Sequence, residues 1–86
     1  MATPSPVSAV GLAIRDVRSR LLERDGVFTQ EHVAHEARVS LRHYQKIEAG
    51  QIDVRLSTLF AIASVLDRRP QQILDRAEEL RSARRR

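Results

Sequence analysis

The sequence contains no cysteine and is poor in glycine, proline and aromatic residues. Its 86 residues include no Cys and no Trp, and only three Gly and three Pro. The absence of cysteine excludes disulfides, thiolate metal sites and cysteine-based catalysis. No stretch approaches the roughly 18 consecutive apolar residues of a membrane-spanning helix, so no membrane partner is expected.

Signals for secretion, catalysis and metal binding are also lacking. Residues 1–6 lack the charged start and apolar core of a signal peptide, which predicts a cytoplasmic protein. No glycine-rich phosphate loop or nucleophile–base pair is recognisable, so an enzyme is not expected. His32 and His35 lie three residues apart, but this is not the His-Glu-x-x-His spacing and no third ligand is evident. We therefore expect neither a metal nor another cofactor.

The charge that is present is mainly arginine. The net charge is +4, and Lys46 is the only one of the 15 basic residues that is not Arg. Such a balance suits an anionic partner, and the guanidinium group pairs in bidentate fashion with phosphate and with guanine edges. A GC-rich coding genome would give the same bias toward Arg, so charge alone favours DNA binding only weakly.

The spacing of apolar residues predicts an all-α chain. Apolar residues recur at steps of three and four, which places them on one face of a helix. The expected helices cover about 8–24, 30–37, 41–49, 57–66 and 70–80. We therefore expect one compact five-helix domain over residues 8–80, with a flexible arm at 1–7 and a basic tail at 81–86.

The residues at the helix ends support these boundaries. Thr29 and Ser40 are expected N-caps, whose hydroxyls accept from the free amides of the next turn. Gly26 and Gly50 follow helices, and Pro70 suits a first helical position because its missing amide costs nothing there. The residues expected to face the core are Val10, Ile14, Val17, Leu21, Val33, Ala34, Ala37, Tyr44, Ile47, Leu59, Ile62, Ala63 and Leu66.

Residues 30–48 contain two short helices separated by only three or four residues. Ala34 is small and lies midway along the first, where a close crossing by the second requires a small side chain. Tyr44 and Ile47 are expected to anchor the second helix to the core. Its outer side then presents residues able to reach into a DNA major groove, namely Leu41, Arg42, His43, Gln45 and Lys46.

Several further residues stand in a characteristic order along most of the chain: Gly11, Ile14-Arg15, Thr29-Gln30-Glu31, Val33-Ala34, Val39-Ser40, Ile47-Glu48, Gly50, Thr58-Leu59, Ile62-Ala63 and Leu66. In this order and spacing, which cover roughly residues 10–75, the chain resembles the Cro/phage-repressor-type helix-turn-helix family, also called the XRE family. The resemblance implies a five-helix, phage-repressor-like DNA-binding fold that usually acts as a dimer.

The resemblance also assigns roles to single residues. Gln30, at the start of the second helix, matches the family's contact to a backbone phosphate. Ser40 and Arg55 are further phosphate candidates. Among the outward residues, Leu41, Arg42 and Lys46 match the recognition positions. Arg42 is expected to contact guanine in bidentate fashion, which contributes about 1–3 kcal/mol of discrimination.

The chain departs from the family pattern in two places. Arg38 stands in the turn where the family usually has Gly, and a left-handed backbone there costs a non-Gly residue about 1 kcal/mol or more. The connection from Arg18 to Gln30 is about five residues longer than usual, which predicts either a longer first helix or a larger loop at 24–28. Glu48 is expected to form an internal ion pair, and the longer connection leaves its arginine partner open.

The last helix carries an apolar stripe of Ile73, Leu74, Ala77 and Leu80. The stripe either closes the core or packs against a second copy of the chain. A homodimer would hold two recognition helices about 34 Å apart on an inverted-repeat operator in double-stranded DNA.

Two functions follow from this pattern. The first is a sequence-specific transcriptional regulator of the repressor or controller type. The alternative is an antitoxin-like or anti-regulator module, which uses the same fold to bind a second protein partner through the last helix.

Overall fold

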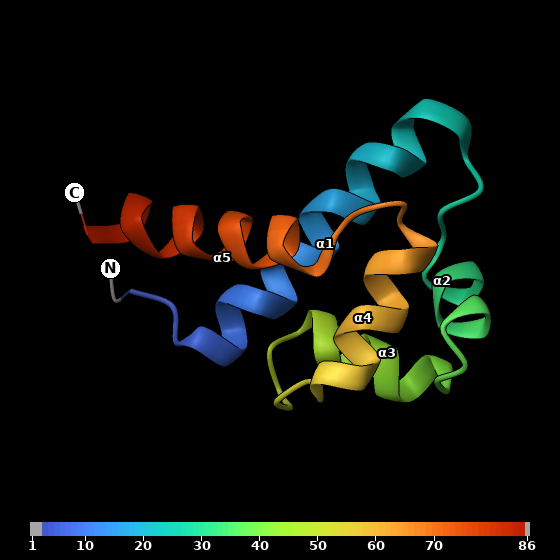
Figure 1. Ribbon diagram of the computed structural model, residues 1–86, viewed down its shortest axis with the longest axis horizontal. Coiled ribbons are helices and arrows are strands. Elements are labelled where there is room, and N and C mark those ends of the chain that lie inside the picture. The colour runs from blue at the N-terminus through green and yellow to red at the C-terminus, as the bar shows by residue number, and fades with distance from the viewer. Residues whose placement is uncertain (1–2, 86) are drawn as a thin grey trace.

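The computed structural model describes residues 3–85, and within them the side chains of residues 3–83. These residues form five helices and no strand, which confirms the predicted all-α fold: α1 (Pro6–Asp25), α2 (Gln30–Glu36), α3 (Leu41–Glu48), α4 (Leu56–Val65) and α5 (Pro70–Arg85). Helix α1 packs along α5, while α2 contacts α3 and α4 at the other end of the molecule (Figure 1). Residues 1–2 of the expected arm and residue 86 of the expected tail lie outside the described residues.

The helices begin where the sequence supplies a cap. The hydroxyls of Thr29 and Ser40 accept from the amides of His32 and His43 at 3.1 and 3.0 Å, which confirms both predicted N-caps. Helix α1 begins two residues earlier than expected, because Ser5 caps it and Pro6 occupies its first position.

Helix α5 continues through residues 81–85, which were expected to form a separate tail. Arg81 contributes to this extension. Its Nε donates to the carbonyl oxygen of Pro4 at 3.2 Å, and its Nη1 lies 3.8 Å from a carboxylate oxygen of Glu78. The segment before α1 and the last turns of α5 are therefore joined.

The core contains the apolar residues that the spacing predicts. Leu21 on α1 and Leu59 and Ile62 on α4 are buried, as is Ile73 on α5. Val10 and Val17 are half-buried against the same cluster. On one side of the core, Asp16 of α1 accepts from Arg76 of α5 at 2.9 Å, which adds a polar link between the two longest helices.

Gly11 sets the approach of α1 to α3. A Cβ atom at this position would lie 2.2 Å from the carbonyl oxygen of Ile47 and 3.2 Å from the amide nitrogen of Gly50. No side chain fits into such a space without moving the backbone of one helix. The glycine therefore holds the end of α3 against α1.

The turn between α2 and α3 contains a residue with a left-handed backbone, which is the costly case for an arginine at this position. Arg38 has φ of 61°, and the only other such non-Gly residue among those described is Asp67, with φ of 54°. The amides of Arg38 and Val39 donate to the carbonyl oxygens of His35 and Ala34 at 3.1 and 3.0 Å. The backbone thus closes the turn as a glycine would allow, at a cost of about 1 kcal/mol for the arginine.

Candidate nucleic-acid interface

Helix α3 is anchored on one side and open on the other. Tyr44, Ile47 and Glu48 are buried. The predicted base-reading residues all lie on the exposed side: Leu41, Arg42, His43, Gln45 and Lys46. Because consecutive residues of a helix point in different directions, the buried side fixes which residues face solvent. The exposed side offers a guanidinium, an amine, an imidazole, an amide and one apolar side chain.

The partner of Glu48 is Arg18 of α1. The Nε and Nη2 atoms of Arg18 donate to the two carboxylate oxygens of Glu48 at 2.7 and 3.1 Å. Helix α1 runs on to Asp25, so the longer connection is a helical extension and not an enlarged loop. Arg18 also donates to the carbonyl oxygen of Phe28 at 3.2 Å, which ties the incoming α1–α2 segment to the pair.

Glu48 also links the pair to α2. Gln30 Nε2 donates to Glu48 Oε1 at 2.9 Å, and Gln45 Nε2 donates to Gln30 Oε1 at 3.3 Å. An ionised carboxylate only accepts, so the amide of Gln30 must turn its NH₂ group toward Glu48. The contact between Gln30 and Gln45 was not expected from the sequence, because it joins two helices through flexible side chains.

Burial and hydrogen bonding act in opposite directions on Glu48. Burial raises the pKa of this carboxyl, but the polar side chains around it, Arg18 foremost, prevail and hold its pKa below the usual range. The hydrogen bond to Glu48 in turn raises the pKa of Arg18. Beside the pair, burial raises the pKa of Tyr44, whose hydroxyl has no hydrogen-bond partner among the described residues.

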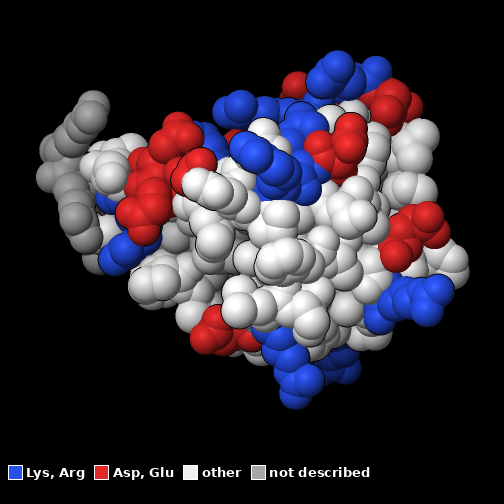
Figure 2. Space-filling model, in the orientation of Figure 1, with Lys and Arg blue, Asp and Glu red and all other residues white. Residues whose placement is uncertain are grey.

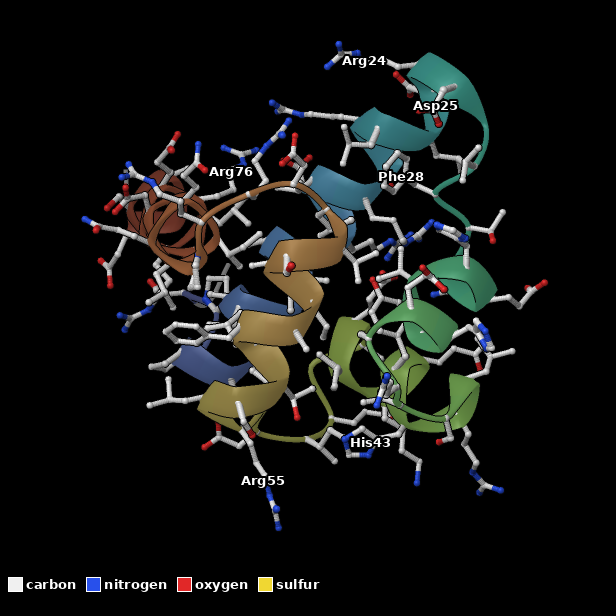
Figure 3. All side chains as sticks on the ribbon, turned by 45° about the vertical axis from the view of Figure 1, so that its right-hand side comes forward. Arg24, Asp25, Phe28, His43, Arg55 and Arg76 are labelled. Atoms are coloured by element: carbon white, nitrogen blue, oxygen red, sulfur yellow. The ribbon has the colours of Figure 1, made fainter. Side chains whose placement is uncertain are left out.

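The three phosphate candidates stand in different surroundings. Gln30 is half-buried in the network with Glu48, and Ser40 is an exposed cap. Arg55 is the exposed residue that precedes α4, and its side chain does not cap that helix. Figure 3 shows Arg55 and His43 at the same end of the molecule, away from Arg24 and Asp25 at the opposite end.

The apolar stripe of α5 is divided by the fold. Ile73 and Ala77 are buried in the chain's own core, so a partner cannot reach them. Leu74 is exposed and Leu80 is half-buried. The stripe was expected either to close the core or to meet a second copy, and these two buried members belong to the core.

Two exposed apolar residues on α4 were missed. Leu56 and Phe60 are 71% and 60% exposed, and one turn separates them along the helix. Figure 2, in the orientation of Figure 1, shows a broad uncharged area over α4. A signal was available, because residues 56–65 contain no charged side chain in a chain that is 30% charged.

Neither a metal-binding cluster nor a membrane-spanning helix occurs among the described residues. No three of their His, Cys, Asp or Glu side chains gather as a metal ion would require. Within the same part of the chain, no helix is both long and apolar enough to cross a membrane.

Two short capped helices, a tight turn and an open second helix define a helix-turn-helix DNA-binding domain. Comparison with known proteins agrees with the geometry. The model of the helix-turn-helix family matches residues 28–73. The chain therefore belongs to the helix-turn-helix family, of the phage-repressor or XRE type, whose members are DNA-binding transcriptional regulators.

Two solved structures are similar to this chain, and both are of the clp gene regulator ClgR from Corynebacterium glutamicum. The first superposes with a TM-score of 0.86 at 24% identity, covering 95% of this chain and 82% of the other. The second has a TM-score of 0.81 at 25% identity, covering 92% of this chain and 95% of the other. No curated protein sequence matches the chain.

Proposed function

We propose that the chain is a sequence-specific transcriptional regulator that binds an inverted-repeat DNA operator as a homodimer. The observation that carries this proposal is the anchoring of α3. Tyr44, Ile47 and Glu48 fix one side of the helix, and the opposite side presents Arg42 and Lys46 to solvent. A helix held in this way can enter a major groove without losing its contact with the core.

The exposed residues of α3 would contact different base edges. Arg42 is exposed near the N-terminus of the helix, where its guanidinium can donate to the O6 and N7 atoms of guanine. Leu41 suits the methyl group of thymine, and His43 and Lys46 can reach neighbouring base edges or phosphates. Gln45 already donates to Gln30, so it retains one N–H and its carbonyl oxygen for DNA.

Phosphate contacts would surround the reading helix. One N–H of the Gln30 amide donates to Glu48, and its second N–H is left for a phosphate oxygen. The amides at the start of α2 add to the attraction for an anion. Ser40 and Arg55 would contact phosphates on either side of α3.

The homodimer rests on the apolar face formed by Leu56, Phe60 and Leu74. Leu74 is 41% exposed on α5, one turn beyond Pro70, and Pro70 lines the same shallow hollow as Phe60. The face begins beside Arg55, at the end of the molecule that carries His43 (Figure 3). A second copy seated there would stand next to the reading surface, as a two-fold dimer on one duplex requires.

The similarity to ClgR supports the regulatory part of the proposal. ClgR is described as a clp gene regulator, and the second comparison reaches 25% identity over 92% of this chain. We propose the same general role, control of genes through DNA binding, for this protein.

Selection of bound sequences from a random DNA pool tests the reading function. We expect enrichment of an inverted repeat whose half-sites lie about one helical turn, or 34 Å, apart. Arg42→Ala should relax the preference at one base pair of each half-site. Arg24→Ala, which removes an arginine at the opposite end of the molecule, should not. A pool that shows no enrichment with the wild-type protein would refute the proposal.

Sedimentation over a range of concentrations tests the homodimer. Phe60→Asp should produce a monomer that binds half-sites weakly. Leu80→Asp serves as the comparison because Leu80 lies beside Leu12, in a separate hollow between α1 and α5. A wild-type monomer at every concentration, with and without DNA, would remove the dimer from the proposal. Dissociation by Leu80→Asp alone would move the interface to α1 and α5.

A further inference from the structure

Arg38 occupies a backbone conformation that its side chain makes costly. Its φ of 61° lies in the left-handed region, where a Cβ atom crowds the following carbonyl and glycine is at ease. The hydrogen bonds that close the turn are made by backbone amides. Glycine would make the same bonds, so the fold of the turn does not require an arginine.

No contact of the Arg38 side chain with the described residues stabilises this strained conformation. The side chain is exposed, and among the described residues it makes no hydrogen bond or ion pair that would offset the strain of the backbone. The other left-handed non-Gly residue, Asp67, is of a type that tolerates this conformation far better. An uncompensated strained residue in an otherwise regular fold points to a function outside the fold.

The position of Arg38 indicates what that function is. The residue lies between Ala37, which ends α2, and Ser40, which caps the reading helix α3. A long cation at this point stands beside the end of α3 that enters the groove. We infer that Arg38 binds a backbone phosphate of the DNA, at the edge of the groove that α3 reads. The inference rests on the proposed function and adds a contact at the very position where the family usually has glycine.

The test measures stability and DNA binding on the same variants. Arg38→Gly should raise Tm by about 4 °C because it relieves the left-handed strain. The logarithm of the DNA-binding constant falls linearly with the logarithm of the salt concentration, and Arg38→Gly should make this fall less steep by about 0.9 for each half-site. Affinity should fall about fivefold to tenfold at 0.1 M salt, equally for the selected operator and for an unrelated duplex. Arg38→Asn should act in the same direction on binding, and Arg38→Lys should keep the salt slope.

Two control variants separate a phosphate contact from general effects. Asp67→Gly places glycine at the other left-handed position, in the α4–α5 turn, and removes no cation, so it should not weaken DNA binding. Arg24→Ala removes one positive charge at the far end of the molecule and should leave the salt slope unchanged. The inference is overturned if the wild type binds DNA and both Arg38→Gly and Arg38→Asn bind with unchanged affinity and slope. If the wild type binds no DNA, the proposed function fails first and this inference fails with it.

Discussion

Removing one partner of the Arg18–Glu48 pair should destabilise the fold more than breaking any other charged contact described here. The two residues are only 8% and 3% exposed. Three N–H groups converge on the carboxylate, at 2.7 and 3.1 Å from Arg18 and at 2.9 Å from Gln30. Arg18→Met removes two of these donors and leaves a buried anion with one, which costs about 3–5 kcal/mol. A domain of this size has a total unfolding free energy of about 4–13 kcal/mol.

A matched surface variant sets the scale for this loss. Arg20 lies on the same helix and approaches Asp16 at 3.5 Å, but its side chain is 68% exposed. Arg20→Met should therefore cost less than about 1 kcal/mol. The contrast between the two methionine variants isolates burial, since both remove one arginine from α1.

The double variant Arg18→Met, Glu48→Leu completes the test. With both charges gone, no buried ion is left uncompensated, so most of the lost stability should return, to within about 2 kcal/mol of the wild type. Urea unfolding followed by circular dichroism at pH 7 measures all four proteins. The reasoning is refuted if Arg18→Met lies within 1 kcal/mol of the wild type, or if the double variant is no more stable than Arg18→Met.

Three further predictions concern the same region. The folded-state pKa of Glu48 is lowered, so its ionisation stabilises the fold fully above its unfolded pKa of about 4.3, and this stabilisation is lost as pH falls through the folded-state pKa. In Arg18→Met, fewer hydrogen bonds oppose the effect of burial on this pKa, so the loss of unfolding free energy in acid should be smaller or change sign. Gly11→Ala should lower the unfolding free energy measured in urea by about 3 kcal/mol, because the new Cβ would lie 2.2 Å from the carbonyl oxygen of Ile47. An unfolding free energy equal to that of the wild type would contradict this. Tyr44→Phe should leave stability unchanged or raise it by about 1 kcal/mol, because it deletes a buried hydroxyl that lacks a partner among the described residues; a clear loss on calorimetry would reveal a hydrogen bond at that hydroxyl.

The parts of the fold that could be predicted are those set by local chemistry. Thr29 and Ser40 cap their own helices, Pro70 starts its own, and Gly26 ends α1. Each depends on a few neighbouring residues, so the sequence alone is enough. The turn at residues 38–39 was placed correctly between the two short helices, but the left-handed backbone of Arg38 was left open, because an arginine stands where the family usually has glycine.

What could not be predicted depends on contacts between distant residues. Arg18 and Glu48 are 30 positions apart, and their meeting depends on how far α1 extends before it turns. The burial of Ile73 and the exposure of Leu74 depend on which side of α5 faces α1. Periodicity placed both residues on one stripe, but it could not choose the part of the stripe that packs inside.

Glu48 connects the base-reading helix α3 to the phosphate candidate Gln30 on α2, so a loss of DNA binding in a variant does not by itself identify a DNA contact. It lies on α3, is held by α1 through Arg18, and itself holds the phosphate candidate Gln30 of α2. A substitution of Arg18 or Glu48 should therefore shift both α3 and Gln30. It should weaken DNA binding even though neither residue contacts DNA itself. Direct contacts can be assigned only at exposed residues such as Arg42 and Arg38, where a loss of affinity must occur without a loss of unfolding free energy. Measuring both quantities on every variant is what distinguishes a residue that reads DNA from one that holds the reader in place.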